Sequence, residues 1–204
     1  MKGNFITLEG IEGSGKSTSL NTITEILTER HIDFILTKEP GGGPLGKDLR
    51  AMLLSKSSEI SPEVELLLMM ADRKNHIDNL VMPNINKGVW VISDRYLDST
   101  YAYQGGGRQI NTSKIDSLAR LLDLPQPDLT LLFDLPPPMA LDRAKKRSEL
   151  DRFESEPMDF HERIRAAYVS LNEDNPERFR LIDSSVDFLE VKKQVETVVL
   201  DFIV

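Results

Sequence analysis

Short apolar segments alternate with longer amphipathic segments along this 204-residue chain, and this alternation limits the possible folds more than any other feature. The apolar segments are rich in β-branched and aromatic residues, which is typical of buried strands. They are FITLEG (5–10), DFILTKEP (33–40), VWVISD (89–94), DLTLLFDL (128–135) and RFRLID (178–183). Strands that alternate with helices are joined by right-handed crossovers, so the sequence predicts an α/β fold with a parallel sheet covered on both faces.

The amphipathic segments carry apolar residues at spacings of three and four, which predicts helices. They are residues 16–30, 62–81, 113–122 and 187–202. No internal repeat, low-complexity stretch or linker interrupts the pattern. Because a chain of this length can bury one sizeable core, we expect a single domain over residues 1–204.

The composition argues against several classes of protein. The chain has no cysteine, which rules out disulfides, thiolate metal sites and cysteine nucleophiles and favours a reducing compartment, the cytoplasm. No apolar run reaches the roughly 20 residues needed to span a bilayer, and MKGNFITLEG lacks the pattern of a signal peptide, so we expect no membrane partner. The net charge of -8 argues against a nucleic-acid partner.

Residues 10–17 read GIEGSGKS and match the pattern G-x-x-x-x-G-K-[ST], with a predicted strand before them and a predicted helix after them. Glycines let backbone N–H groups converge on a phosphate, and the N-terminus of the helix adds a favourable field. Lys16 would reach the outer phosphates, and the Ser17 hydroxyl would ligate Mg²⁺. The loop predicts a bound nucleoside triphosphate, although an ordinary glycine turn is the alternative. It does not by itself distinguish a kinase from a GTPase or a motor.

A kinase needs a second pocket for the phosphoryl acceptor, and clusters of glycine and charge at the predicted strand ends supply candidates. In a parallel sheet the ligand site lies beyond the carboxyl ends of the strands. The candidate segments are KEPGGGPLGKDLR (38–50), MADRKN (70–75) and SDRYLDSTYAYQGGGR (93–108). Arginine donates bidentately to a monophosphate, and Thr, Tyr and Gln can bond the edge of a base.

Each of these residues also has a purely structural interpretation. Arg50 and Arg108 could be solvated surface charges, and Arg73 could form an ion pair with Asp72 or Asp78. Tyr101 and Tyr103 could pack a helix. Asp94 could cap a helix, although its position beside the phosphate loop favours a role in the Mg²⁺ shell through water.

Residues 143–152 read RAKKRSELDR and contain five cations. They could be a solvated helix end. In a phosphoryl-transfer enzyme, cations that close over ATP neutralise the charge that develops between donor and acceptor, and closure excludes water. We therefore predict a small lid over approximately 143–154.

Taken together, the motifs FITLEGIEGSGKST, KEPGG, DRYLDSTYAYQGGGR, PDLTLLFDLPP and RSELDRFE resemble those of the bacterial thymidylate kinase family, in the nucleoside monophosphate kinase group of P-loop NTPases. The resemblance covers nearly the whole chain. It implies transfer of the ATP γ-phosphoryl group to dTMP with Mg²⁺, giving dTDP, a step in dTTP synthesis for DNA replication. It also implies a five-stranded parallel sheet, a mobile lid and a homodimer.

The resemblance also assigns site residues. The ATP-binding set is Gly10, Ile11, Glu12, Gly13, Ser14, Gly15, Lys16, Ser17, Thr18 and Arg143, with Arg143 stacking on adenine. The dTMP-binding set is Glu12, Glu39, Pro40, Arg50, Met69, Arg73, Arg95, Ser99, Thr100, Tyr103 and Gln104. Lys16, Arg147, Glu12 and Arg95 are implied to be catalytic, and Ser17 and Asp94 to hold the metal. The absence of a cation from residues 11–14 fits the subtype whose catalytic arginine lies in the lid, where Arg147 and Arg152 fall.

Two residues depart from the family's pattern. Met69 stands where many members have a phenylalanine on the thymine ring, and a thioether can still cover a ring face. Lys38 replaces an arginine before EPGG, so a point charge replaces a planar fork.

Three rival functions remain open at this stage. Another pyrimidine monophosphate such as dUMP could be the substrate, because the thymine methyl contributes only about 1–3 kcal/mol in an apolar pocket. A nucleoside kinase is disfavoured, since a neutral hydroxyl needs no bidentate cation. A GTPase is disfavoured because no N-K-x-D motif follows a strand: residues 86–89 read NKGV and precede one.

Overall fold

The computed structural model describes residues 2–147 and 149–203, with the side chain of Arg147 left out. Five strands form one sheet in the order β2-β3-β1-β4-β5, and every neighbouring pair is parallel. The strands are β1 (Phe5–Glu9), β2 (Phe34–Lys38), β3 (Trp90–Asp94), β4 (Leu129–Asp134) and β5 (Phe179–Asp183). The predicted five-stranded parallel sheet is confirmed. Since β1 lies at its centre, the loop that follows β1 opens at the middle of the carboxyl edge.

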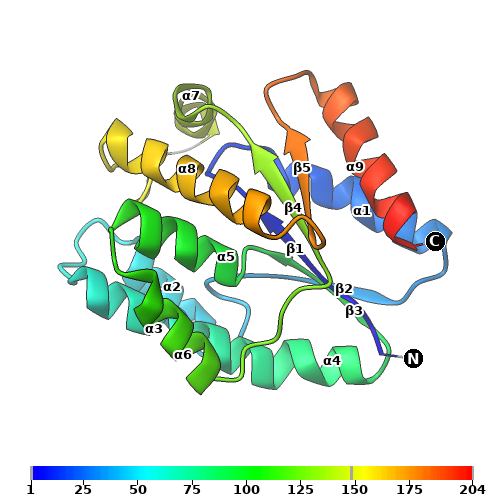
Figure 1. Cartoon of the computed structure of the whole chain (residues 1–204), viewed down its shortest axis with the longest axis horizontal. Coiled ribbons are helices and arrows are strands. Elements are labelled where there is room, and N and C mark those ends of the chain that lie inside the picture. Colours follow the sequence, from blue (N-terminus) through cyan, green and yellow to red (C-terminus); the bar gives the residue numbers. More distant parts are fainter. Residues whose placement is uncertain (1, 148, 204) are drawn as a thin grey trace.

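One face of the sheet is covered by α1 (Lys16–Glu29) and α9 (Phe188–Ile203), which lie side by side in Figure 1. Ile23 and Leu27 of α1 and Val195 of α9 pack there against Ile6 and Leu8 of β1. All five side chains are fully buried. The apolar stripe that predicted α1 is the surface by which this helix joins the core.

The opposite face is covered by helices from the middle of the chain (Figure 1). They are α3 (Pro62–His76), η1 (Ile77–Val81), α4 (Met82–Asn86), α5 (Leu97–Thr100) and α6 (Thr112–Leu121), while α2 (Gly46–Leu54) lies against α3. Phe5 of β1 stacks edge-on against Tyr96, with ring centroids 4.8 Å apart. Because Phe5 and Ile6 point to opposite faces, this single strand organises both layers.

The helix predicted over 62–81 begins as expected and ends later. Pro62 occupies the first turn, and the Ser61 side chain caps the helix by accepting from the Val64 N–H. The helix continues through the π-helical η1 into α4 and ends at Asn86, although Pro83 lies inside it. A π-helical turn shifts the backbone hydrogen bonds just before the proline, which allows the helix to pass a residue that lacks an N–H.

A third group of helices lies beside β4 and β5, next to the candidate site at the carboxyl ends of β1, β2 and β3. It consists of η2 (Tyr101–Gly107), α7 (Pro137–Arg147) and α8 (Met158–Asp174), and α8 was not predicted. A Cβ on Gly107 would lie 2.5 Å from the Phe160 ring, and one on Gly106 would lie 2.8 Å from Ala167 Cβ. The second and third glycines of GGGR therefore allow α8 to pack closely on η2.

Within the described residues, no helix has both the length and the apolarity needed to cross a membrane.

Candidate active site

The loop between β1 and α1 has the backbone geometry of a phosphate cradle. Gly10, Gly13 and Gly15 have φ angles of 133°, 77° and 94°. A Cβ on Gly13 would lie 2.3 Å from the Ala140 carbonyl oxygen, so only glycine fits there. Helix α1 begins at Lys16 without a side-chain cap, which leaves its positive end available to an anion.

The Lys16 ammonium folds over this loop. Its Nζ donates to the carbonyls of Gly10 at 2.9 Å and Ile11 at 3.0 Å. Burial, together with repulsion from Arg95, lowers the pKa of Lys16 to about 8. A phosphate beside this ammonium would stabilise the charged form, so the loop is electrostatically suited to an anion.

One cavity of ≈ 510 Å³ brings most of the predicted site residues together. Predicted residues on its wall are Glu12, Gly13, Ser14, Gly15, Lys16, Ser17, Thr18, Glu39, Pro40, Arg50, Met69, Arg73, Asp94, Arg95, Ser99, Thr100, Tyr103, Gln104 and Arg143. Gly10 and Ile11 do not line the cavity. Their carbonyls accept hydrogen bonds from Lys16, which does line it. Residues not in the predicted sets that line it are Lys38, Leu54, Asp151, Phe153 and Glu154.

Glu12 links the phosphate loop to the rest of the cavity. One of its carboxylate oxygens accepts from Arg95 Nη2 at 2.6 Å, and the other accepts from the Tyr103 hydroxyl. Burial opposes ionisation of Glu12, but Arg95 and Lys16 outweigh it and hold the pKa of this carboxyl below its usual value. Glu12 is therefore an anion that orients Arg95.

Arg95 is held from several sides. Its φ angle of 75° lies in the left-handed region, which residues with a side chain seldom adopt. Nη1 donates to Ser99 Oγ at 3.1 Å and to the Tyr168 hydroxyl at 3.2 Å, and the guanidinium lies 4.9 Å from the Tyr103 ring centroid. This network fixes a guanidinium on the cavity wall before any substrate contacts it.

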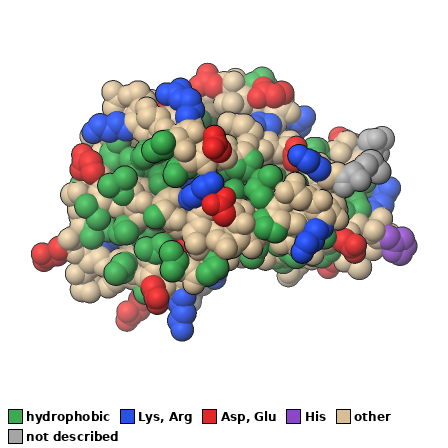
Figure 2. Space-filling model, turned by 90° about the horizontal axis from the view of Figure 1, so that it is seen from below, with side chains coloured by type: hydrophobic (Ala, Val, Ile, Leu, Met, Phe, Trp, Pro, Cys, Tyr) green, Lys and Arg blue, Asp and Glu red, His purple; other side chains and the backbone are tan. Residues whose placement is uncertain are grey.

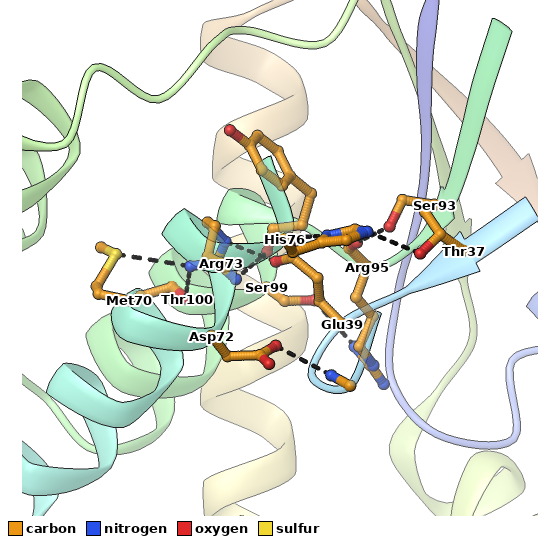
Figure 3. A network of polar contacts seen from close by, with 12 residues as sticks. Thr37, Glu39, Met70, Asp72, Arg73, His76, Ser93, Arg95, Ser99 and Thr100 are labelled. Carbon is orange, nitrogen blue, oxygen red and sulfur yellow. Dashed lines mark hydrogen bonds and ion pairs between the residues drawn. The ribbon is translucent and has the colours of Figure 1, made fainter. Parts of the chain in front are cut away.

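Arg73 is buried in a second network, drawn in Figure 3. Its Nε donates to Glu39 Oε2 at 2.7 Å, and Nη1 donates to Thr100 Oγ1 at 2.7 Å. His76 Nδ1 lies 2.8 Å from the other Glu39 oxygen, and its Nε2 lies 2.7 Å from the Thr37 hydroxyl. Arg73 does form an ion pair, as the structural interpretation of the sequence allowed, but its partner is Glu39 and not Asp72 or Asp78. Asp78 pairs with Lys74.

The segment after β2 is held close to α3. Arg50 Nη1 donates to the Pro40 carbonyl at 2.8 Å, so Arg50 lies on the cavity wall and is not a free surface charge. Asp72 Oδ2 accepts from the Gly41 N–H at 3.0 Å, and burial raises the pKa of this carboxyl. These contacts position the glycines of EPGGG against the helix that carries Arg73.

Two further arginines converge on the buried carboxylate of Glu65 in α3. Arg152 Nη1 lies 2.8 Å from Glu65 Oε2, and Arg108 Nη2 lies 3.1 Å from the same oxygen. Arg152 also donates to the Leu53 carbonyl at 2.8 Å and covers the Phe153 ring. Arg108 is thus not the solvated charge of the alternative interpretation, and Arg152 is anchored to α2 and α3.

The other predicted lid cations differ from Arg152. Arg143 is exposed and lies on the cavity wall, whereas Lys145 and Lys146 are exposed and do not line the cavity. Within the described part of the chain, these three carry no ion pair. The predicted catalytic side chain of Arg147 lies outside the described residues.

Sequence reasoning missed a buried carboxylate, Glu9, and its partner Tyr168. Glu9 Oε2 accepts from Ser99 Oγ at 2.5 Å and from the Tyr168 hydroxyl at 3.0 Å. Burial and the nearby Asp98 raise the pKa of Glu9 to about 7. The apolar spacing of Phe160, Ile164 and Tyr168 after a proline could have indicated α8, but the sequence offers no signal that its tyrosine reaches β1.

The residues proposed for magnesium fit that ion. Asp94 Oδ1 is buried and has no hydrogen-bond partner among the described residues, and Asp94 shares the cavity with the exposed Ser17. The described chain has no cluster of three or more His, Cys, Asp or Glu residues that could hold a metal. Mg²⁺ commonly takes one or two protein ligands and completes its shell with substrate phosphate and water, so this sparse donor set suits it.

The geometry defines a class of enzyme. A parallel sheet with a glycine-rich loop between β1 and α1 is a P-loop NTPase fold, and an arginine-lined pocket in the same cavity is what distinguishes a nucleotide kinase from a simple hydrolase. The protein is therefore a nucleoside monophosphate kinase of the P-loop group.

Comparison with known proteins identifies the family. The family model described as thymidylate kinase matches residues 8–195. The thymidylate kinase of Carboxydothermus hydrogenoformans is 48% identical over 184 residues, covering 90% of each chain. That of Nitrosomonas europaea is 43% identical over 202 residues, covering 98% of this chain and 94% of the relative. A crystal structure of thymidylate kinase from Ehrlichia chaffeensis superposes with a TM-score of 0.80 at 33% identity, covering 98% of this chain and 99% of that one. The chain belongs to the thymidylate kinase family.

Proposed function

We propose that this protein transfers the γ-phosphoryl group of ATP to the 5′-phosphate of dTMP, giving dTDP and ADP. The observation that carries the proposal is that a phosphate loop and a pocket lined by Arg50, Arg73 and Arg95 share one cavity. Water as acceptor needs no such pocket, and a nucleoside hydroxyl needs no such cations. Family membership supplies thymidylate as the acceptor.

In the reaction, an oxygen of the dTMP phosphate attacks the γ-phosphorus of ATP, and the bond from that phosphorus to the β–γ bridging oxygen breaks. ADP leaves with the electron pair. The loop N–H groups and Lys16 hold the β- and γ-phosphates at the start of α1. Arg95, held by Glu12, offsets charge on the acceptor phosphate, with Arg50 on the same wall.

Ser17 and Asp94 would hold Mg²⁺, Asp94 through water. When bound, this ion would neutralise charge on the donor phosphates. The unpartnered Asp94 oxygen on the cavity wall supports the assignment.

We further propose that residues 143–154 form a lid. The exposed Arg143 on the cavity wall would stack on adenine, and Arg147 would be the catalytic cation of the lid. The anchoring of Arg152 to Glu65 makes Arg147 the better candidate. A lid of this kind would exclude water and so protect the phosphoryl group from hydrolysis.

The proposed homodimer has support from the surface. Apolar side chains gather where α2, α3 and α6 lie, as Figure 2 shows from below. Exposed members on α3 include Val64 at 43% and Leu67 at 55%, and Met52 on α2 is 55% exposed. Gathered apolar side chains of this kind mark interfaces between proteins. Light scattering that gives a monomer at micromolar concentration would contradict the dimer. The cytoplasmic location stays a prediction.

The test of the function is ADP release with MgATP against a panel of acceptors: dTMP, dUMP, UMP, CMP, AMP, GMP, thymidine and none. We expect strong dependence on dTMP. Some turnover of dUMP is expected because both bases present the same polar edge, and it should be slower because uracil lacks the methyl group. Equal rates across the pyrimidines would mean that Met69 has loosened the pocket. Turnover without an acceptor would contradict the kinase proposal.

A further inference from the structure

Glu65 lies at the junction between the thymine side of the cavity and two partly buried arginines. It is 1% exposed, in the first turn of α3. Its Oε1 accepts from Gln104 Nε2 at 2.8 Å and from Arg108 Nε at 3.3 Å. Its Oε2 faces Arg152 Nη1 at 2.8 Å, Arg108 Nη2 at 3.1 Å and Arg108 Nε at 3.2 Å. Gln104 therefore contacts one oxygen, while the closest guanidinium contact and most of the others fall on the second oxygen.

This arrangement fixes which way the Gln104 amide points. Guanidinium groups can only donate hydrogen bonds, and an ionised carboxylate can only accept them. The NH₂ of Gln104 must then face Glu65, and the amide oxygen must face the other way. The orientation follows from the chemistry of the neighbours, which is the proper basis for assigning an amide. Within the described part of the chain, no hydrogen-bond donor contacts the side-chain oxygen Oε1 of Gln104.

An amide oxygen on the cavity wall discriminates between pyrimidines. Gln104 lines the cavity together with Thr100, Tyr103 and Arg73. Thymine and uracil carry a hydrogen on N3, which can donate to that oxygen. Cytosine N3 has a lone pair instead, so the same oxygen would meet another acceptor. A site that offers a fixed acceptor therefore rejects cytosine strongly.

We propose that Glu65 is a positioning residue for base selection: by holding the Gln104 NH₂ it presents the amide oxygen to N3 of the base. This inference rests on the proposed function, because it assumes a pyrimidine monophosphate in the cavity. Arg108 and Arg152 contribute by holding its second oxygen.

Glu65→Gln is the sharpest test, because the two arginines determine how the new amide is oriented. Three guanidinium nitrogens face the position of Oε2 and only Arg108 Nε faces that of Oε1, so they favour an oxygen at Oε2 and place the new NH₂ at Oε1. Gln104 must then rotate, so that it accepts from residue 65 and points its own NH₂ into the cavity. We expect kcat/KM for dTMP relative to dCMP to fall at least about 10-fold.

Glu156→Gln is the matched control. Glu156 lies 2.5 Å from Arg108 Nη1 and, like Glu65, neutralises that arginine, but it does not contact Gln104. The dTMP-to-dCMP ratio should stay as in the wild type. An equal fall in both variants would mean that the arginine cluster as a whole matters, and would overturn the proposal.

Gln104→Leu gives an independent test that leaves the arginine pairs of Glu65 in place. In this variant kcat/KM for dTMP relative to dCMP should fall to a similar extent. Introducing Glu65→Gln into Gln104→Leu should then cause no further fall in that ratio. If Glu65→Gln does not fold, an unchanged ratio in Gln104→Leu still overturns the proposal, because Glu65 then has no base-reading group to position. If the wild-type protein shows no dTMP-dependent turnover, the proposed function is overturned. If the wild type turns over dTMP but Glu65→Gln leaves the dTMP-to-dCMP ratio unchanged, only the role of Glu65 is overturned.

Discussion

The phosphate loop and the acceptor pocket lie on one cavity, but they are built in different ways. The loop is a continuous stretch of backbone from Gly10 to Ser17, and its one cation, Lys16, bonds the carbonyls of its own loop. The acceptor pocket is built from side chains far apart in sequence. There Arg73 pairs with Glu39, and Arg95 pairs with Glu12, which the phosphate loop itself supplies.

Because of this difference, losing the loop lysine should affect phosphate binding, whereas breaking an arginine pair of the pocket should also reduce the stability of the fold. A local loop can lose its lysine without leaving a distant partner unpaired, because carbonyls that lose this donor can turn to water. A buried arginine cannot be separated from its carboxylate in the same way, since the remaining charge would stay in a medium that solvates it poorly. The acceptor pocket should therefore be part of the core as well as part of the site.

Glu39→Gln tests the acceptor side and should have the largest effect. Arg73 is 2% and Glu39 3% exposed, so the change leaves a buried guanidinium without its counter-charge. We expect the free energy of unfolding to fall by about 3 to 5 kcal/mol, together with a raised KM for dTMP. Urea unfolding measures the first, with Glu63→Gln on the exposed surface of α3 as control. A loss no greater than that of the control would contradict the buried-pair account.

Lys16→Ala tests the donor side. The ammonium is the only side-chain cation of the loop, so turnover should drop at least about 100-fold, which corresponds to about 2.7 kcal/mol or more in the activation barrier. The midpoint of urea unfolding should change little. Lys114→Ala, on the exposed face of α6, is the control for loss of a lysine. Near-normal turnover in Lys16→Ala would show that the loop is not the phosphate site.

Glu9→Gln tests whether the buried carboxylate beneath Arg95 titrates. The pKa of Glu9 is raised from 4.5 to about 7, so the folded state binds this proton more tightly than the unfolded state does. Its contribution to stability is present below pH 4.5 and is lost as the pH rises to about 7, by about 3 kcal/mol in all. Relative to wild type, Glu9→Gln should therefore gain stability between pH 4.5 and pH 8. A constant difference in unfolding free energy across that range would contradict the shifted pKa.

Arg147→Ala tests the proposed lid. A cation that acts on the transferred phosphoryl group works mainly in the transition state, so kcat should fall at least about 10-fold, with a smaller rise in the KM for dTMP. Steady-state kinetics with dTMP varied at saturating MgATP separates the two constants. A change confined to KM would move Arg147 from catalysis to substrate binding.

Asp78→Ala gives the smallest expected effect and shows what an exposed pair contributes. Lys74 and Asp78 form an i,i+4 ion pair on the surface, with side chains 35% and 52% exposed. Water and salt screen such a pair, so the unfolding free energy should change by no more than about 0.5 kcal/mol. A loss as large as that of Glu39→Gln would remove the distinction between buried and surface pairs.

The same contrast explains what could be predicted from the sequence. The five strands and the loop 10–17 follow from local pattern, because period, turn residues and glycine spacing act over a few neighbours. The partners of the arginines do not follow from it. Proximity in sequence favours Asp72 or Asp78 as the partner of Arg73, yet Arg73 pairs with Glu39, which follows β2. Nothing in the sequence of the predicted lid indicates that Arg152 contacts Glu65 in α3. Contacts between residues far apart in the chain produce no periodic pattern in a single sequence, so they cannot be predicted from it.

The most direct test of the account is whether the loop and the pocket bind two nucleotides at once. A dinucleotide in which adenosine and thymidine are joined through their 5′ carbons by a polyphosphate chain should occupy both sides. Isothermal titration should then give a Kd at least about 100-fold below that of ATP or dTMP alone, since the second contact becomes intramolecular. Lys16→Ala should weaken this binding strongly. A dinucleotide that binds no more tightly than ATP would contradict the claim that donor and acceptor share one cavity.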